Sequence, residues 1–326
     1  MTTFTANSTY YDNTRLSDYK ACPRQYFIRH VLGWTVDYGR VAAPLIFGGA
    51  WHEGQDAIWR YGNKADQPTL TALAYEAFVK YWVENGYPED LDDVDYARLN
   101  PRIPMVAKEM YWNYVEARGS LLKRCKVLAI EQPFAVPLPN LENCWYVGRL
   151  DKVIEDNGQR LVIEHKTTTL YRVQGNFDPN YLDSWWVSSQ VKGYQFGAGL
   201  YFEGIDGVWV DCALVHKKVH DGFRFVPISH NIALLQEWLV TTQTWAAEVT
   251  NATERWKAGE SVESCFKKNE DSCYGKYGAC QFLDICRTTA DPTTLNGVPH
   301  GYKEERWEPF DILKLDKLVK QENTND

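Results

Sequence analysis

The sequence predicts an α/β protein with a mixed-sheet core and an outer helical layer built from both ends of the chain. Strand-like runs dominate residues 127–168 and return at 208–215 and 223–228. Helical periodicity is found before, between and after these strands, at 68–83, 106–117, 185–202 and 232–256. The chain has 326 residues, of which 44% are hydrophobic and 24% charged, and this composition fits one large globular unit. No apolar run reaches the roughly 18 residues that a membrane helix needs.

The clearest local signal is a β-hairpin whose turn is Asn157-Gly158, the pair that a two-residue type I′ turn prefers. Counting outward from this turn places Asp151 directly opposite Glu164 on the partner strand. Side chains alternate between the two faces of a strand, so Lys166 shares the face of Glu164 and the His165 side chain points the other way. The hairpin is therefore expected to carry two carboxylates and a lysine on one face.

Like charges that face each other across a sheet are destabilising, and a divalent cation would remove this penalty. Oxygen ligands on rigid strands, with positions left open for water, suit Mg²⁺ or Mn²⁺. Such an ion can polarise a phosphoryl oxygen and lower the pKa of its bound water, while a nearby lysine orients that water. The pattern indicates phosphodiester hydrolysis, and the simpler alternative is a solvated hairpin with a charged outer face.

Four short elements follow one another in an order that resembles a known family. Residues 148–151 (GRLD) and 163–167 (IEHKT) resemble the GxxD…ExK core of the PD-(D/E)XK nucleases, in particular the RecB-like exonuclease branch. Residues 48–54 and 190–194 resemble the GxxxH and QxxxY elements of that branch. The resemblance implies a restriction-endonuclease-like mixed-sheet core and a metal-dependent nuclease activity.

The resemblance also implies a role for each motif residue. Asp151 and Glu164 would hold the metal together with His52, and the carbonyl of His165 would add a ligand. Lys166 would position the attacking water, and Gln190 and Tyr194 would bind the scissile strand or steady Lys166. Glu131 is a further acidic residue that would lie near the metal, although a surface glutamate on an edge strand is the simpler interpretation.

Cysteines supply an independent line of argument, because four of the eight crowd into residues 265–286. The polar residues 1–13 give no sign of secretion, so metal or cluster ligation is favoured over disulfides. In the iron–sulfur subset of the RecB-like branch, which includes AddB and the CRISPR-adaptation exonucleases, one cysteine precedes the nuclease core and three follow it. Residues 16–26 resemble the first of these elements. The resemblance implies a 4Fe–4S cluster held by Cys22, Cys273, Cys280 and Cys286.

Two alternatives to this cluster remain open from the sequence. The spacing between Cys273 and Cys280 departs from the family pattern, so Cys265 could replace Cys273 as a ligand. Four thiolates can also hold Zn²⁺. In either case the metal would join both ends of the chain as a structural staple. The remaining cysteines, Cys125, Cys144 and Cys212, lie in apolar contexts and are expected to be buried small side chains.

The motifs divide the chain into four expected segments. Residues 1–47 form an amino-terminal helical segment with the first cluster cysteine, and residues 48–260 form the RecB-like nuclease core. Residues 261–290 form the three-cysteine segment, and residues 291–326 form a tail.

The net charge of −8 argues against a protein that coats nucleic acid, but a nuclease needs only a local positive track. One candidate track lies beside the first cluster cysteine, at Lys20, Arg24 and Arg29. The other is residues 215–224, which are predicted to form a second hairpin with basic residues at an Asp221-Gly222 turn.

The expected function is that of a cytoplasmic, metal-dependent deoxyribonuclease that acts on single-stranded DNA or DNA ends in recombination, repair or phage-type DNA processing. No pair of P-loop motifs is present, so any unwinding would come from a separate helicase or recombination protein. Two other classes stay open: a catalytically silent nuclease-like fold that binds DNA or protein, and a zinc protein with an unrelated hydrolase activity. The sequence does not distinguish exonuclease from endonuclease action.

Overall fold

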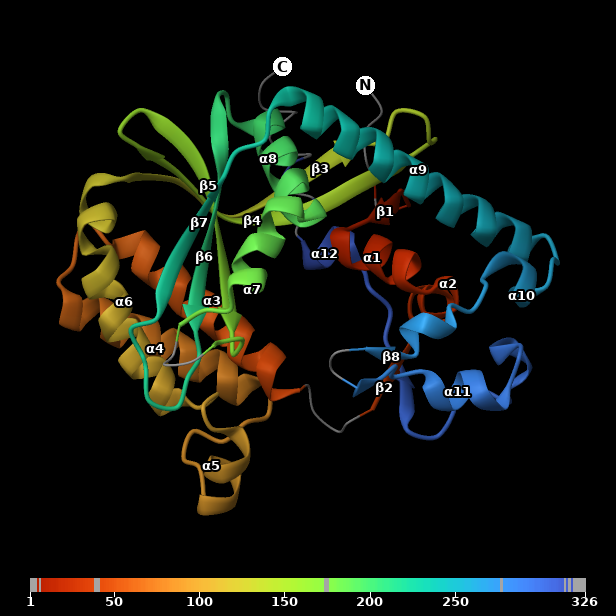
Figure 1. Cartoon of the computed structure of the whole chain (residues 1–326), viewed down its shortest axis with the longest axis horizontal. Helices are drawn as coiled ribbons and strands as arrows, with labels where there is room; N and C mark the ends of the chain where they lie inside the picture. Colours follow the sequence, from red (N-terminus) through yellow and green to blue (C-terminus); the bar gives the residue numbers. More distant parts are fainter. Residues whose placement is uncertain are drawn as a thin grey trace. The chain divides into compact units, whose positions relative to one another are not determined.

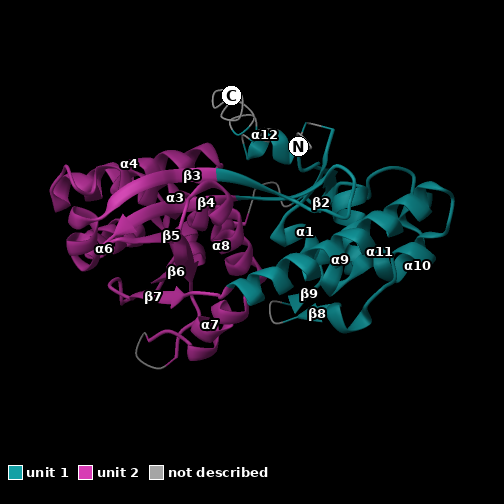
Figure 2. Cartoon of the chain, turned by 90° about the horizontal axis from the view of Figure 1, so that it is seen from above, with its two compact units in different colours: residues 1–38, 133–148, 232–326 teal, residues 39–132, 149–231 magenta. Residues whose placement is uncertain are grey.

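The computed structural model describes residues 5, 7–37, 42–172, 176–275, 278–313, 315 and 318. The chain forms two compact units, each assembled from segments that are far apart in the sequence (Figure 2). Unit 1 comprises Met1–Tyr38, Pro133–Gly148 and Ile232–Asp326, and unit 2 comprises Gly39–Gln132 and Arg149–Asn231. These divisions differ from the expected segments, because residues 133–148 and 232–260 group with the two ends of the chain rather than with residues 48–132.

A mixed sheet is the centre of unit 2 (Figure 1). Strand β5 (Gln159–Thr168) pairs antiparallel with β4 (Cys144–Asp156) and parallel with β6 (Ile205–Leu214), and β7 (Phe223–Ile228) pairs antiparallel with β6. Strand β3 (Lys126–Pro137) pairs with β4. The predicted α/β class with a mixed sheet is confirmed.

The hairpin has the register that was counted from its turn. Asn157 and Gly158 have φ angles of 51° and 79°, the two positive values that a type I′ turn requires. The pairing runs from Asp156 opposite Gln159 to Lys152 opposite Ile163. The next residues outward are Asp151 and Glu164, which are therefore brought to the same end of the hairpin.

Long helices cover one face of this sheet. They are α3 (Ala43–Tyr61), α4 (Gln67–Glu84) and α6 (Pro104–Arg124), with the short α5 (Asp93–Leu99) between the last two. Helix α4 begins where the Asp66 side chain accepts the Thr69 N–H at 3.0 Å, a helix cap that satisfies one free backbone donor. Helix side chains such as Trp51 and Tyr111 form a common core with Ile163 of β5.

The opposite face of the sheet receives a second helical layer. It consists of α7 (Pro179–Ser184), a 3-10 turn (Trp185–Val187) and α8 (Ser189–Tyr201), and α8 contacts β5 and β6. The alternation along β5 separates the two layers, since Ile163 packs on the long helices and Glu164 faces α8.

Unit 1 brings both ends of the chain together with the longest helix, α9 (Ile232–Lys257). Strand β1 (Thr9–Tyr11) pairs parallel with the start of β4, and β2 (Trp34–Val36) pairs antiparallel with β10 (Tyr302–Glu304). The helical elements near the amino terminus are α1 (Asn13–Ala21), α2 (Pro23–Tyr26) and a π-helical turn (Phe27–Val31).

The carboxy-terminal part of unit 1 is built from short elements. They are α10 (Val262–Cys265), a 3-10 turn (Glu270–Ser272), β8 (Tyr274–Gly275), β9 (Gly278–Ala279), α11 (Leu283–Thr288), a second 3-10 turn (Pro292–Thr294) and α12 (Pro309–Ile312). None of the described helices combines the length and the apolar character that crossing a membrane would require.

Candidate metal centre

The hairpin of unit 2 brings an acidic residue and a lysine of β5 into direct contact. Nζ of Lys166 lies 2.5 Å from Oε1 of Glu164. Nζ also lies 5.7 Å from the centre of the Trp185 ring, within the range of a cation–π contact. Lys166 is thus held between a carboxylate and an aromatic ring at the edge of the site.

Asp151 is fixed from two sides. The backbone N–H of His165 donates a hydrogen bond to Oδ2 of Asp151 at 2.8 Å, and Nδ1 of His52 lies 3.3 Å from the same oxygen. His52 is presented by α3, which also contains Gly48 and Gly49, so this helix reaches the hairpin. One ligand atom each from His52, Glu131 and Asp151 lie within 4.8 Å of one another.

Glu131 is the member of this group that the sequence did not favour. It lies on β3, which pairs with β4, and it has a φ angle of 54°, a backbone conformation that is uncommon for a residue with a side chain. Its carboxylate contacts Nε of Arg149 at 2.5 Å. Glu131 is thus a partly exposed glutamate of an edge strand, as the simpler interpretation has it, but it also lies beside His52 and Asp151. No spacing in the sequence marks this placement, because it depends on the local distortion of the strand.

Glu164 is almost completely buried, and α8 orients it. Nε2 of Gln190 donates to Oε1 of Glu164 at 3.2 Å and lies 2.9 Å from the hydroxyl of Tyr194, one helical turn further on. The other oxygen of Glu164, Oε2, is buried and has no hydrogen-bond partner among the residues that the structure describes. A buried carboxylate oxygen without a partner is costly, unless a cation satisfies it.

Burial and the neighbouring charges shift the pKa values of the three carboxylates of the site. Burial, followed by the charge of Asp151, raises the pKa of Glu164 to about 7. Burial also raises the pKa of Glu131 to about 7, although Arg149 acts against this. Burial opposes ionisation of Asp151 as well, but His52 and two further positive neighbours hold its pKa well below the usual range. A bound cation would relieve the excess of negative charge.

This donor set fits a divalent cation that prefers oxygen ligands. The ligand atoms that converge are the carboxylates of Glu131 and Asp151 and one imidazole nitrogen of His52. Glu164 does not belong to this converging group, and its buried Oε2 is a proposed further ligand. Carboxylate oxygens and water are the ligands that suit Mg²⁺ and Mn²⁺. The carbonyl of His165 stays a proposed additional ligand.

Behind the site, on the face toward the long helices, the His165 side chain joins a buried polar cluster. Its Nδ1 lies 3.4 Å from Oδ2 of Asp211 on β6. The hydroxyl of Tyr114 donates to Asp211 at 2.7 Å, and Nη2 of Arg118 lies 2.7 Å from its other oxygen. The prediction that His165 points away from Glu164 is confirmed.

A second buried charge pair supports the same strand. The Lys152 side chain is fully buried, and its Nζ lies 2.5 Å from Oδ1 of Asp56 on α3. The charge of Lys152 contributes to the low pKa of Asp151. The sequence gives no sign of these roles of Lys152 and Asp211, since both residues stand in strand patterns that indicate burial but not a partner.

In unit 1, the four cysteines proposed as cluster ligands line one small hollow: Cys22, Cys273, Cys280 and Cys286. The N–H of Asn269 points to Sγ of Cys22 at 3.4 Å. Burial raises the pKa of Cys280 and Cys286, so their thiolates would need a compensating positive group such as a metal. Cys265 lines a different hollow, and Cys125, Cys144 and Cys212 are buried as expected.

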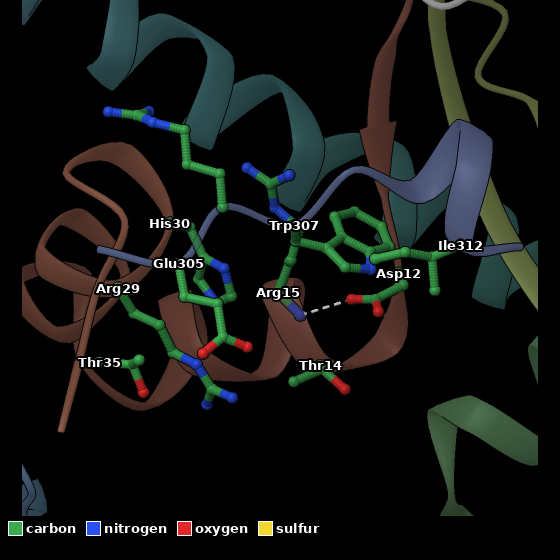
Figure 3. A pocket seen from close by; sticks show the side chains of 10 residues that line it. Asp12, Thr14, Arg15, Arg29, His30, Thr35, Glu305, Trp307 and Ile312 are labelled. Atoms are coloured by element: carbon green, nitrogen blue, oxygen red, sulfur yellow. Dashed lines mark hydrogen bonds between the residues drawn. The ribbon is translucent and has the colours of Figure 1, made fainter. Parts of the chain in front are cut away.

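The candidate basic track near Cys22 is only partly a surface feature. The prediction is wrong for Arg24, which is buried and donates to the carbonyls of Phe266 and Ala290. Arg29 pairs with Asp18 at 3.2 Å and lines a hollow of about 300 Å³ together with Arg15 and Glu305 (Figure 3). Basic and acidic groups are mixed in this hollow.

The second candidate track is not a tight hairpin. Strands β6 and β7 do pair antiparallel, as the predicted hairpin requires. However, β6 ends at Leu214 and β7 begins at Phe223, so residues 215–222 form a longer loop, and the predicted turn at Asp221-Gly222 is wrong. Gly222 lacks the positive φ that such a turn needs. Lys217 and Lys218 are nevertheless exposed on this loop.

A sheet that carries two carboxylates and a lysine at this spacing, beside a helix that carries a histidine, is the arrangement of a nuclease. The family model of the PD-(D/E)XK nuclease superfamily matches residues 13–287, and the chain belongs to this superfamily.

Among solved structures, the chain is similar to a protein from Eubacterium rectale that is provisionally described as an exonuclease. The two share 14% sequence identity and superpose with a TM-score of 0.49, over 90% of this chain and 95% of the other. A comparison with curated proteins found no match.

Proposed function

We propose that this member of the PD-(D/E)XK superfamily is a divalent-metal-dependent deoxyribonuclease of the RecB-like branch. The observation that carries the proposal is the convergence of Asp151, Glu164 and Lys166 at one end of the hairpin, beside His52. A protein that only binds DNA has no need for buried carboxylates that lie close to one another. DNA in single-stranded form or at an end is the proposed substrate, in recombination, repair or phage-type DNA processing.

Each polar side chain has a distinct task in this proposal. Gln190 occupies Oε1 of Glu164 and leaves Oε2 available to a cation. Burial opposes the charge of Lys166, but Glu164 and Asp151 outweigh it and raise the Lys166 pKa, so the ammonium group persists at neutral pH. A fixed positive charge at this position orients the attacking water and stabilises charge that develops on the phosphate. A bound divalent cation would polarise a phosphoryl oxygen and lower the pKa of a water.

The test is digestion of end-labelled DNA by the wild type and by Asp151→Ala and Lys166→Ala, with Mn²⁺ or with EDTA. Cleavage should require the metal and should be lost in both variants, while circular dichroism shows that they remain folded. Lys123→Ala, an exposed lysine in the same unit, serves as the matched control. Linear and circular substrates, each single- and double-stranded, separate exonuclease from endonuclease action. Wild-type rates in both site variants would refute the assignment.

We also propose that Cys22, Cys273, Cys280 and Cys286 hold a 4Fe–4S cluster, with Zn²⁺ as the alternative. The shared hollow supports this, because it collects thiols from residue 22 and from residues 273–286. Such a group would act as a structural staple within unit 1, and no redox step is required of it. In this proposal, a separate helicase or recombination protein supplies the unwound DNA.

A further inference from the structure

A hollow of about 550 Å³ lies in unit 2 beyond the ends of β5 and β6. These strands run parallel, so the segments that follow them meet at the same edge of the sheet. Thr169 and Tyr171 come from the segment after β5, and residues 215–218 come from the loop after β6. Arg102, which precedes α6, completes the wall.

The hollow is rich in positive charge that is not neutralised locally. Its cations are Arg102, Lys217 and Lys218, and within the described part of the chain none of them forms an ion pair with a carboxylate. Nη2 of Arg102 instead donates to Oγ1 of Thr169 at 3.0 Å, which fixes the guanidinium at the wall. Cations placed together without acidic partners are typical of phosphate-binding surfaces.

The loop that carries the lysines is ordered by His216. Nδ1 of His216 accepts the backbone N–H groups of Lys218 and Val219, both at 3.1 Å. The His216 ring packs edge-on against Tyr171, with ring centres 4.6 Å apart. The Tyr171 residue is 50% exposed, so an aromatic ring stands beside the cations and is accessible to a ligand. An exposed ring next to phosphate-binding cations suits an unpaired base, which stacks on it without sequence preference.

Strand β5 links this hollow to the metal centre. Lys166 and Thr169 are three residues apart, a separation of about 10 Å along an extended strand. A strand of DNA whose scissile phosphate lies at Lys166 would therefore reach the hollow within a few nucleotides.

We propose that this hollow is a subsite for single-stranded DNA, in which Arg102, Lys217 and Lys218 bind phosphates and Tyr171 stacks on a base. The subsite rests on the proposed nuclease function and specifies how its substrate is held. It predicts that unpaired DNA beside the scissile bond contributes to affinity, whereas the chemical step depends on the metal centre alone.

The test measures binding of a fluorescein-labelled oligothymidine by fluorescence anisotropy in EDTA, over a range of salt concentrations. The double variant Lys217→Ala/Lys218→Ala should reduce the slope of log affinity against log salt by about 1.4, since each phosphate contact to a single strand contributes about 0.7. The double variant Lys123→Ala/Lys126→Ala removes two exposed lysines elsewhere in unit 2 and should leave the slope unchanged.

Tyr171 provides an independent readout. Tyr171→Leu should weaken binding about fivefold or more without changing the salt slope, while Tyr171→Phe should bind like the wild type, because it keeps the ring. With Mn²⁺ supplied, Tyr171→Leu and Lys217→Ala/Lys218→Ala should raise the KM for DNA, whereas the control pair Lys123→Ala/Lys126→Ala should keep the wild-type KM and kcat.

The outcomes separate this inference from the nuclease proposal. A wild-type slope in Lys217→Ala/Lys218→Ala, an equal loss in the control pair, or wild-type affinity in Tyr171→Leu would overturn the subsite. If the wild type cleaves DNA while the pocket variants bind normally, only the subsite fails. If the variants change binding as expected but the wild type cleaves nothing, the subsite stands and the nuclease proposal fails.

Discussion

The backbone N–H of His165 donates a hydrogen bond to Oδ2 of Asp151 at 2.8 Å, just beyond the last regular pair of the hairpin, Lys152 and Ile163. The same carboxylate oxygen lies 3.3 Å from Nδ1 of His52. The strand that carries Glu164 and Lys166 thus aims Asp151 toward the helix that carries His52. The geometry of the candidate metal centre consequently depends on the register of the hairpin.

Gly158→Val tests this dependence. Gly158 has a φ of 79°, which a β-branched residue resists, and an added Cβ would meet no atom within 4 Å. The cost is therefore conformational, about 1–2 kcal/mol of unfolding free energy. A slip by one residue would turn Glu164 and Lys166 away from Asp151, so DNA cleavage should fall with or before stability.

Urea unfolding and DNA cleavage, measured on the same preparations, check the Gly158 prediction. Gly158→Asn is the control, because asparagine tolerates a positive φ and should retain more of both properties. A valine variant with unchanged stability and activity would show that the turn does not set the register.

Removing Asp211 should destabilise the protein through the buried cluster behind the site. Asp211→Leu leaves the guanidinium of Arg118 in a buried position without its partner, which costs about 3 kcal/mol of unfolding free energy. The double variant Asp211→Leu/Arg118→Met removes both charges and should be more stable than the single variant. Denaturant unfolding of the three proteins is the measurement, and equal stability of the two variants would contradict a paired charge.

The sequence predicted the parts of the site that depend on local geometry. The Asn157-Gly158 turn sets which residues of the hairpin face each other. The alternation of side chains along a strand then places Asp151, Glu164 and Lys166 on one face. Contacts between distant segments were not predictable in this way. Glu131 reaches the site through a positive φ that its residue type does not favour, and Asp56, the partner of Lys152, lies on a helix nearly a hundred residues earlier.

The two candidate basic tracks also depend on contacts that the sequence does not reveal. Residues 215–224 have the Asp-Gly pair of a tight hairpin, yet β6 ends at Leu214, so residues 215–222 separate it from the start of β7 at Phe223. His216 instead folds its ring back onto the backbone of the loop, and this contact outweighs the turn preference of the pair. Arg24 likewise stands next to a cysteine motif, but its hydrogen bonds to the carbonyls of Phe266 and Ala290 draw it into the interior.

A pH dependence of stability follows from Glu164. Its pKa is raised from an ordinary value near 4.5 to about 7, so between these values the folded protein keeps a proton that the unfolded chain releases. Stability contributed by this residue therefore falls as the pH rises through this window. Glu164→Gln, which has no such proton to lose, should gain stability relative to the wild type from pH 4.5 to pH 7 and then level off.

Thermal unfolding of the EDTA-treated proteins across this pH range gives the Glu164 comparison. Other groups titrate in both proteins, so the prediction concerns the difference in stability between Glu164→Gln and the wild type at each pH. Addition of Mn²⁺ at pH 7 should stabilise the wild type more than Glu164→Gln, because the cation favours the carboxylate form. A difference that is constant with pH would mean that Glu164 ionises normally.

The cysteine hollow leads to the last prediction, which concerns the ligands of the proposed cluster. Replacing Cys22, Cys273, Cys280 or Cys286 by alanine should abolish iron and labile sulfide in anaerobically purified protein and should lower its stability. Cys265→Ala should keep a full complement of iron, because Cys265 lines a different hollow from the other four. Cys273→Ala and Cys265→Ala form a matched pair, since the two positions compete for one role. Loss of metal in Cys265→Ala but not in Cys273→Ala would show that Cys265, and not Cys273, is the ligand. Stoichiometric zinc in the wild type would show that the four thiolates hold zinc in a tetrahedral site instead of an iron–sulfur cluster.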